Sequence, residues 1–479
     1  MKYYDAVVIG GGVLGCFAAR NLRRWSLSAA LLEAEEDVCT GITRANSAIV
    51  YAGYDNKTGS LKAQMTVAGN AGFYRLCENL EVPFSRCGSL MVSSGEQGER
   101  VLNKKYTNGL QNGVPELRLL SGGEAREMEP MLSERVTAAL YAPTTGTVNP
   151  WQLGIAAFEN AVANGCDPLL HTQVLGIAQR NSRYIVKTET EELECRVVLN
   201  CAGLAADKVQ ELLFPPSIRL FFDGADFLVL DRNAISPSRI IFHESEDHGR
   251  GITAIPTVEG NLLLGPTKRK LDGKPFATTA QGLSILLDDS KDLLPTLDLT
   301  QVIRSFGAVR PNPHRVVLRD GAYVPDGTSI GSFAIENPAP GFWSLLGIKT
   351  PGLTCADVLG CYLAEQAANY LDAAENTIFD PHRRAMTRRS DRNGEQWNRL
   401  VSESGDYGEI VCQCEGVTKG EILEAIARGA RSVDGVKRRV GSGMGRCQGG
   451  RCALEIARIL HQTGIEDPKF HFEPKGGRL

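Results

Sequence analysis

Four cysteines near the C-terminal end of the chain have the spacing of a metal site. Cys412 and Cys414 form a Cys-x-Cys pair, and Cys447 and Cys452 follow as a Cys-x4-Cys pair. Four thiolates suit either a zinc ion or a two-iron cluster. The Cys-x-Cys spacing is tighter than that of the usual zinc knuckle, and the glycines in residues 441–446 offer backbone N–H groups that can bond to cluster sulfides. The pattern therefore favours a [2Fe–2S] cluster, with zinc and free thiols as the alternatives.

A glycine-rich turn near the N-terminus predicts a dinucleotide site. Gly10, Gly12 and Gly15 form a Gly-x-Gly-x-x-Gly pattern, which follows the apolar residues 5–9 and opens an apolar-periodic stretch. Such glycines let the backbone approach a pyrophosphate, whose charge then lies at a helix N-terminus. Glu33 ends the next apolar stretch, where a carboxylate can accept hydrogen bonds from ribose hydroxyls. We therefore expect FAD or NAD rather than NADP, with a tight packing turn as the alternative.

Further segments have small or polar residues where backbone would approach a bound cofactor. They are residues 40–47 (TGITRANS), 146–151 (GTVNPW), 200–207 (NCAGLAAD) and 347–354 (GIKTPGLT). These segments resemble the flavin-contact segments of D-amino-acid-oxidase-like FAD oxidoreductases, and the resemblance covers roughly residues 3–375. Within this family the chain is most similar to the large subunits of anaerobic glycerol-3-phosphate dehydrogenases. The cysteine segment resembles the bacterioferritin-associated-ferredoxin-like [2Fe–2S] domain found at the end of such subunits.

The resemblance implies that the cofactors are FAD and a [2Fe–2S] cluster. It assigns cofactor contacts to Gly10, Gly12, Gly15 and Glu33. It also assigns flavin contacts to Thr43, Asn46, Ser47, Val174, Ala202, Gly203, Gly347, Lys349, Gly352, Leu353 and Thr354. A helix that begins near Thr354 would direct its N-terminus at the flavin, where negative charge builds on reduction. Lys349 would add a full positive charge there, and a surface lysine in a turn is the alternative.

The expected substrate residues are Arg310, Lys349 and Tyr51. The resemblance places Arg310 on the substrate side of the flavin, where an arginine fork pairs with a carboxylate or phosphate. A surface ion pair at a strand end is the alternative for Arg310. Residues 51–55 (YAGYD) replace a segment similar to HSGAR in glycerol-3-phosphate dehydrogenases, so the matched histidine and arginine are absent. His243 is expected to be packed rather than catalytic.

Together these features predict an FAD-dependent dehydrogenase of a small anionic alcohol that is similar to glycerol 3-phosphate. A flavin takes two electrons as a hydride, whereas an iron–sulfur centre takes one at a time, so a chain with both passes electrons onward. An electron-acceptor protein or partner subunit is therefore expected. The alternatives are an amino-, imino- or 2-hydroxy-acid dehydrogenase subunit, and a non-catalytic electron-transfer subunit.

The elements that must position these residues are of mixed α/β type. Residues 5–9, a helix to about residue 25 and residues 29–33 predict one βαβ unit. Further strands are expected at 184–188, 196–200, 227–231 and 261–265, and helices at 151–164 and 354–371. The resemblance implies a Rossmann-like FAD-binding domain (1–80, 145–215, 320–375) interleaved with an antiparallel-sheet substrate domain (81–144, 216–319), then a linker or packing arm (376–408), a small helical [2Fe–2S] domain (409–465) and a tail (466–479).

The composition excludes several classes of protein. The 479 residues include 52 Lys and Arg against 56 Asp and Glu, a net charge of −4 that gives no reason to expect nucleic acid. With 43% hydrophobic and 23% charged residues, the chain is neither disordered nor fibrous. The longest apolar run, residues 6–19, is too short to span a bilayer, and Asp5 argues against a signal peptide. Most of the 13 cysteines are scattered singly, so we expect reduced thiols and a cytoplasmic protein, with peripheral membrane attachment through a partner left open.

Overall fold

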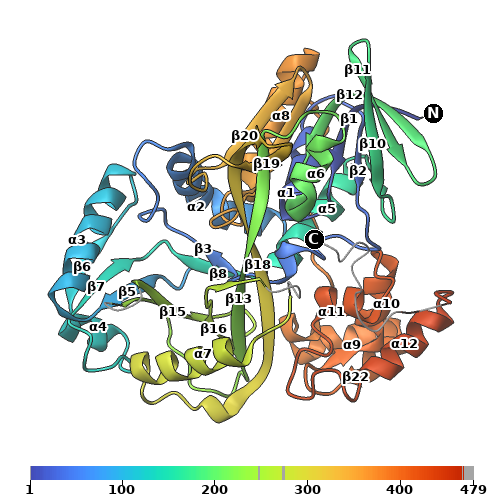
Figure 1. Cartoon of the computed structure of the whole chain (residues 1–479). Coiled ribbons are helices and arrows are strands. Elements are labelled where there is room, and N and C mark those ends of the chain that lie inside the picture. The colour runs from blue at the N-terminus through green and yellow to red at the C-terminus, as the bar shows by residue number, and fades with distance from the viewer. Residues whose placement is uncertain (1, 246–248, 272–275, 467, 469–479) are drawn as a thin grey trace.

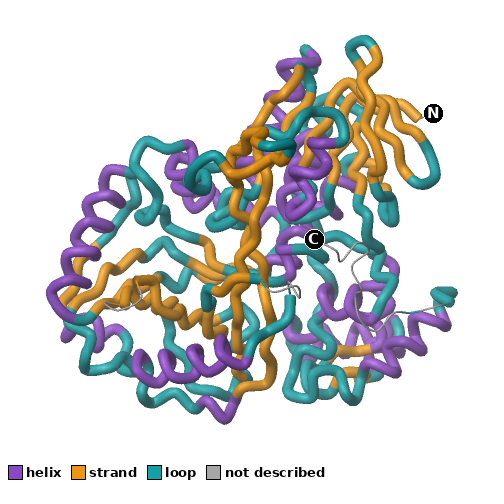
Figure 2. Tube along the Cα trace, in the orientation of Figure 1, coloured by secondary structure: helices purple, strands orange, loops and turns teal. Residues whose placement is uncertain are grey.

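The computed structural model describes residues 2–245, 249–271, 276–466 and 468 (Figure 1). The chain forms two large sheets with helices packed against them, and a small helical module at its C-terminal end (Figure 2). This mixed architecture confirms the predicted fold class. The predicted tail, residues 466–479, lies outside the described residues except at positions 466 and 468.

The first sheet contains the predicted βαβ unit. Its strands are β1 (Lys2–Ile9), β2 (Ala29–Leu32), β9 (Cys166–Leu169), β10 (Val174–Arg180), β11 (Arg183–Thr188), β12 (Glu192–Asn200), β20 (Ala334–Ala339) and β21 (Phe342–Leu346). β1 lies between β12 and β2 and is parallel to both. Helix α1 (Val13–Leu22) connects β1 to β2 and ends before Trp25, because Trp25 leaves the helix to form a bridge with Glu375.

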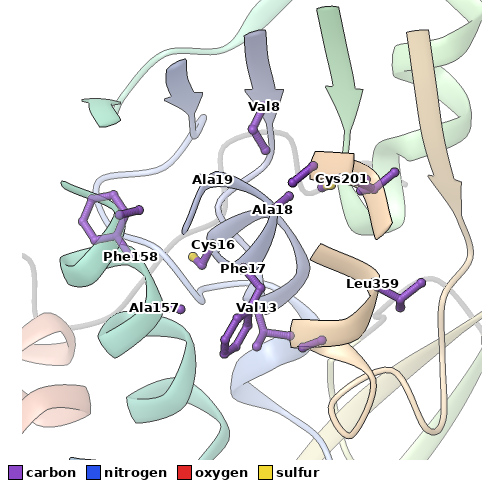
Figure 3. Close-up of a cluster of buried hydrophobic side chains, with 14 of the residues drawn as sticks. Val8, Val13, Cys16, Phe17, Ala18, Ala19, Ala157, Phe158, Cys201 and Leu359 are labelled. Atoms are coloured by element: carbon purple, nitrogen blue, oxygen red, sulfur yellow. The ribbon is translucent and has the colours of Figure 1, made fainter. Parts of the chain in front are cut away.

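Three helices cover one face of this sheet: α1, α5 (Pro150–Ala163) and α8 (Ala356–Leu371). Val8 of β1 and Phe17 of α1 pack here against Ala157 and Leu359 of the two flanking helices (Figure 3). A Cβ at Gly360 would lie 2.7 Å from the backbone of Phe17, so α8 crosses α1 at the closest distance that a glycine allows. The packing holds the N-terminus of α1 at the carboxyl end of β1.

The second sheet is mostly antiparallel. Its strands are β5 (Ser89–Ser93), β6 (Arg118–Ser121), β7 (Ala138–Ala142), β13 (Ile218–Leu230), β14 (Ile240–Ser245), β15 (Gly249–Pro256), β16 (Leu262–Gly265), β17 (Arg269–Lys270), β18 (Val302–Arg319) and β19 (Ala322–Pro325). β14 and β5 are the parallel exception. The predicted strand 227–231 is the end of the much longer β13, which pairs with β18 along its length.

Smaller elements complete the two large layers. Helices α2 (Leu61–Asn79), α3 (Gly95–Gln111), α4 (Gly122–Met128), α6 (Ala206–Glu211) and α7 (Ala280–Leu293) flank the sheets, and β3 (Ile49–Val50), β4 (Phe84–Ser85) and β8 (Gly146–Val148) form a small third sheet. Within the described ranges, no helix combines the length and the apolar character that crossing a membrane requires. All thirteen cysteines are free thiols.

Residues 376–408, called the arm below, pack against both the sheets and the C-terminal module. Arg383 pairs with Glu159 of α5 at 2.7 Å, and Met386 is buried in the hydrophobic core of the module. The arm includes α9 (Gly394–Glu403). The module, residues 409–465, is built from β22 (Ile410–Cys412), β23 (Val417–Thr418), α10 (Lys419–Ala427), α11 (Val433–Val440) and α12 (Ala453–Gln462).

Candidate functional site

A cavity of about 1010 Å³ opens where the carboxyl ends of β1 and β12 meet the long strands of the second sheet. Its wall includes Gly10, Gly12 and Glu33 from the βαβ unit, and Asp223 and Arg310 from β13 and β18. Cofactor pockets in proteins reach roughly 1,000 Å³. The volume therefore suits a dinucleotide together with a small substrate.

The three glycines of the Gly-x-Gly-x-x-Gly motif have different structural roles. Gly10 has a φ of +102°, and a Cβ there would lie 2.6 Å from the carbonyl oxygen of Cys201. A Cβ at Gly15 would lie 1.8 Å from the carbonyl oxygen of Gly10, so Gly15 allows helix and turn to pack and does not line the cavity. Gly12 is the N-cap of α1 and offers no capping side chain. The N–H of Val13 donates to Oγ1 of Thr43 at 3.0 Å, and Gly12 and Leu14 line the cavity, where their backbone can approach a pyrophosphate.

Glu33 lies in the cavity wall and is held by backbone donors. Its Oε2 accepts the N–H of Gly11 at 2.6 Å, and its Oε1 accepts the N–H of Glu35 at 2.9 Å. Burial raises the pKa of Glu33, and these backbone hydrogen bonds act in the opposite direction. The side chain is therefore fixed in one orientation at the end of β2.

Most of the other predicted residues also lie in the cavity wall: Thr43, Asn46, Ser47, Tyr51, Ala202, Gly203, Arg310, Lys349, Gly352 and Leu353. Val174, Gly347 and Thr354 do not. Val174 begins β10 and packs against a hydrophobic core, and a Cβ at Gly347 would touch Leu220 and Pro313 at 2.9 Å. Thr354 is buried, where its Oγ1 accepts the backbone N–H of Tyr51 at 3.0 Å. It positions the segment that carries Tyr51 rather than facing the cavity.

Four cations gather at one end of the cavity, and we call Lys62, Lys268, Arg310 and Lys349 the cation cluster. Burial lowers the pKa of Lys349, and the nearby charges of Lys62 and Arg310 lower it further. The Nζ of Lys349 donates to Oδ1 of Asn312 at 2.5 Å, and Nδ2 of Asn312 donates to Oδ2 of Asp223 at 3.0 Å. Of the charged groups that shift the pKa of Lys349, Lys62, Arg310 and Lys268 lower it and Asp223 raises it.

Sequence reasoning did not identify Lys62, Lys268, Asn312 or Asp223 as site residues. Asn312 stands two residues after Arg310 on β18, so both side chains lie on the same face of the strand. The two-residue spacing from Arg310 could therefore have identified Asn312 from the sequence. Lys62 and Lys268 come from α2 and from the turn after β16, and only the tertiary fold brings them together.

The histidine in this region does not reach the cavity. Phe242 lines the wall and stacks on Tyr51 with ring centroids 6.0 Å apart. His243, the next residue along β14, is outside the wall, and burial lowers its pKa. Successive side chains alternate across a strand, so the expectation that His243 is packed agrees with its position.

The four module cysteines form two pairs. Cys412 and Cys452 lie close enough for each thiol to shift the pKa of the other, and so do Cys414 and Cys447. The neighbouring thiol of Cys452 and the backbone N–H groups of Gly443 and Glu415 lower the pKa of Cys412. Among the described residues, no three metal-binding side chains gather around a single point. Two separate pairs suit a cluster of two irons better than one tetrahedral zinc ion.

A buried ion triad joins the module to the first sheet. The carboxylate of Asp37, in the loop after β2, accepts hydrogen bonds from Arg438 at 2.7 Å and from Arg439 at 2.7 and 2.9 Å. Burial acts to raise the pKa of Asp37, but the charges of Arg439 and Arg438 outweigh it and hold the pKa below its ordinary value. The module is therefore fixed to the loop after β2 by a buried charged contact.

Comparison with known proteins identifies two regions of the chain. The family model described as FAD dependent oxidoreductase matches residues 5–366. The model described as BFD-like [2Fe-2S] binding domain matches residues 410–462. The first match takes in the cavity and the second takes in the four module cysteines.

Two relatives are named as dehydrogenases, one matched along the whole chain and one along part of it. A glycerol 3-phosphate dehydrogenase of Caloramator mitchellensis is 37% identical over 486 residues, covering 99% of this chain and 98% of the relative. The human mitochondrial L-2-hydroxyglutarate dehydrogenase is 31% identical over 281 residues, covering 55% of this chain and 60% of that protein. In fold, the chain is similar to L-alpha-glycerophosphate oxidase from Mycoplasma pneumoniae with FAD bound, with a TM-score of 0.69, 22% identity and coverage of 80% of this chain and 98% of that one.

Proposed function

Because this chain belongs to the FAD dependent oxidoreductase family and ends in a BFD-like [2Fe-2S] binding domain, we propose that it oxidises a doubly charged alcohol of the glycerol 3-phosphate type and passes the electrons through the cluster to an external acceptor. The full-length relative that carries the name glycerol 3-phosphate dehydrogenase supports this substrate class.

The cation cluster is the observation that carries the proposal. Lys62, Lys268, Arg310 and Lys349 stand close together in the cavity wall, and Asp223 is the carboxylate held among them through Asn312. A phosphate monoester brings up to two negative charges and accepts the fork of an arginine, so it relieves this repulsion more than a zwitterionic amino acid does.

We assign the following work to the residues of the chain. Arg310 and Lys268 hold the phosphate, and Tyr51 offers a hydroxyl to the reacting end of the substrate. Lys349, oriented by Asn312, supplies positive charge where negative charge develops during the reaction. FAD, when bound, takes the hydride from the carbon that bears the hydroxyl. The N-terminus of α1 and Glu33 would hold its pyrophosphate and ribose.

We also propose the predicted division into domains, with one boundary moved. The strands of the first sheet all come from residues 1–80, 145–215 and 320–375, which supports an FAD-binding domain made of these ranges. β19 (Ala322–Pro325) pairs with β18 of the second sheet. The boundary between substrate and FAD-binding domains is therefore better placed after Pro325 than at residue 320.

Anaerobic bleaching of the flavin absorbance tests the substrate class. We expect glycerol 3-phosphate to bleach the bound flavin without any added acceptor, and uncharged glycerol to bleach it far more slowly, because glycerol cannot engage the cation cluster. Bleaching by glycine or proline but not by glycerol 3-phosphate would contradict the proposal.

A 2-hydroxy dicarboxylate is the second candidate substrate. It also carries two negative charges and a secondary alcohol, and the partial relative named L-2-hydroxyglutarate dehydrogenase favours it. Steady-state kinetics with an artificial electron acceptor separates the two candidates through the ratio of their kcat/KM values. A higher value for L-2-hydroxyglutarate than for glycerol 3-phosphate would replace the first candidate with the second.

A further inference from the structure

The two cysteine pairs differ in their access to solvent. Cys412 and Cys452 are each 1% exposed and belong to the hydrophobic core of the module. Cys414 is exposed and Cys447 is half-buried. One edge of the cysteine site therefore lies inside the module and the other lies at its surface.

The buried pair shares the hydrophobic core of the module with α11. Lys437 of α11 lies within electrostatic range of Cys452, and burial lowers the pKa of Lys437 to about 8. The neighbouring Arg438 contacts Asp37 and lies within electrostatic range of Arg44, which stands in the cavity wall. In Figure 1, α11 is on the side of the module towards the sheets, and α12 is on the outer side. The Cys412–Cys452 edge therefore lies in the module core beside α11, and the loop of Cys447 also contacts the start of β18, where Arg304 donates to Gln448 at 3.1 Å and Arg446 donates to Gln301 at 2.9 Å.

The exposed pair is framed by a basic and apolar surface. Arg451 connects the two cysteine loops, because its Nη1 donates to Oε1 of Gln413 at 3.4 Å. That partner is a neutral amide, and among the residues that the structure describes Arg451 forms no ion pair. Leu454, in the first turn of α12, is 58% exposed. We call Gln413, Cys414, Cys447, Arg451 and Leu454 the exit surface.

The acids around the exit surface are already engaged by other arginines. Glu415, next to Cys414, forms an ion pair with Arg232, which follows β13 of the second sheet. Glu455 of α12 pairs with Arg458 at 3.0 Å. Arg446, which precedes Cys447, is 66% exposed and approaches Asp231 at 3.7 Å. The surface that surrounds the exposed cysteines is therefore positive on balance.

We propose that the exit surface docks a small acidic one-electron carrier protein, an inference that rests on the electron export in the proposed function. Arg451 gives charge complementarity, and Leu454 gives an apolar contact of the kind that anchors a transient interface. Oxidation of one alcohol to its ketone releases two electrons and two protons. Two carrier molecules are each reduced by one electron, and the protons go to solvent, so the FAD and the cluster return to their oxidised state.

Binding of a plant-type [2Fe–2S] ferredoxin, used as an acidic probe, tests the surface independently of turnover. We expect the holoprotein to bind oxidised ferredoxin in calorimetry, more weakly as salt is added. Arg451→Glu should weaken the Kd by about tenfold or more, and Arg451→Lys should restore most of the affinity. Arg135→Glu is the matched control, since Arg135 is 77% exposed between α4 and β7, away from the module in Figure 1.

Each outcome decides the proposal. The paramagnetic signal of the reduced cluster confirms that a variant keeps its cysteine site. Absence of ferredoxin binding, or an equal loss with Arg135→Glu, would overturn the exit surface even if glycerol 3-phosphate bleaches the flavin. Binding of the holoprotein to phosphatidylserine vesicles through Arg451, without ferredoxin binding, would also overturn it in favour of a membrane surface. If the surface binds ferredoxin but no substrate bleaches the flavin, the proposed function fails and the docking site stands.

Discussion

At the residue scale, the proposed function assigns the charge of Arg310, in the cavity wall, to the substrate anion. Replacement of Arg310 by Leu should raise the KM for glycerol 3-phosphate about 10- to 100-fold, because a charged hydrogen bond contributes roughly 1.5–3 kcal/mol. Steady-state kinetics with an artificial acceptor measures the effect. Arg315→Leu is the control on the same strand, since Arg315 is exposed and lies 3.9 Å from Glu336. An equal effect of the two substitutions would remove Arg310 from the site.

The lowered pKa of Lys349 predicts an alkaline limit to activity. A lysine whose pKa is lowered loses its charge at a lower pH than usual, so kcat/KM for the anionic substrate should fall as the pH rises, starting below the ordinary lysine value of 10.5. Lys62→Met removes a neighbouring positive charge and should move this fall to higher pH.

Lys268→Met is the matched control for the alkaline limit. Lys268 affects the pKa of Lys349 less than Lys62 does. Its replacement should therefore move the alkaline fall by a smaller amount. If the two pH profiles are identical, Lys349 is not the titrating group.

Individual residues were predicted unevenly from the sequence. Glu33 and the motif glycines follow from a local pattern in which the chemistry and the turn share the same few residues. Lys62 and Lys268 did not stand out, because a lysine on a helix or in a turn looks like any surface lysine until distant segments meet. The assignment of Val174 to the flavin stays a prediction from the resemblance, and its side chain packs against a hydrophobic core.

At the scale of elements, the turn between β1 and α1 contains two glycines with different roles. Gly15 allows the helix to pack on the turn, and Gly12 lines the cavity. Gly15→Ala should lower the Tm, because its Cβ would fall 1.8 Å from the backbone oxygen of Gly10. Gly12→Ala should fold, since the nearest atom to its Cβ is Oγ1 of Thr43 at 3.6 Å, but it should retain less FAD because the methyl group faces the pyrophosphate.

Thermal unfolding and flavin content measure these two glycine variants. A Gly-to-Ala change inside a helix usually stabilises by about 1 kcal/mol, so destabilisation at Gly15 has the opposite sign to the general rule. A Gly15→Ala protein with normal Tm and full FAD would contradict the close packing of helix and turn.

Helices and strands were predicted best where a regular apolar pattern is bounded by turn residues. The βαβ unit, α5 and α8 were located to within a few residues, because their apolar patterns are regular and bounded by turn residues. The full length of β13 and β18 was not predicted. Both strands contain charged and polar residues that face the cavity, so the alternation that identifies a strand is interrupted where the site lies.

At the scale of the whole molecule, Asp37 holds the module in place. Asp37→Asn should lower the free energy of unfolding by about 3–5 kcal/mol, because it leaves buried Arg438 and Arg439 without a counter-charge. Electron transfer from flavin to cluster should slow, while substrate still bleaches the flavin. Chemical denaturation and single-turnover spectroscopy measure these two effects.

The pH dependence of stability gives a second measurement of the same contact. A carboxylate with a lowered pKa in the folded state stabilises above its ordinary pKa of 3.8, and this stabilisation is lost as the pH falls through the lower folded value. The acid-induced loss of stability should therefore be smaller in Asp37→Asn. Glu191→Gln is the control, since the pair of Glu191 with Lys2 is exposed and should contribute little. Equal pH profiles in the wild type and Asp37→Asn would contradict the role of the triad.

The order of residues around the cavity also determines when a newly made chain can acquire its cofactor. The wall begins at Gly10 and is not complete until Leu353, and β21 joins β12 only after residues 342–346 have been made. Asp37 then meets arginines 401 and 402 residues further along the chain. A ribosome-bound chain therefore exposes an incomplete flavin site until Leu353 has emerged, and flavin capture should follow that step. Supply of FAD late in translation, rather than early, should limit the yield of active protein.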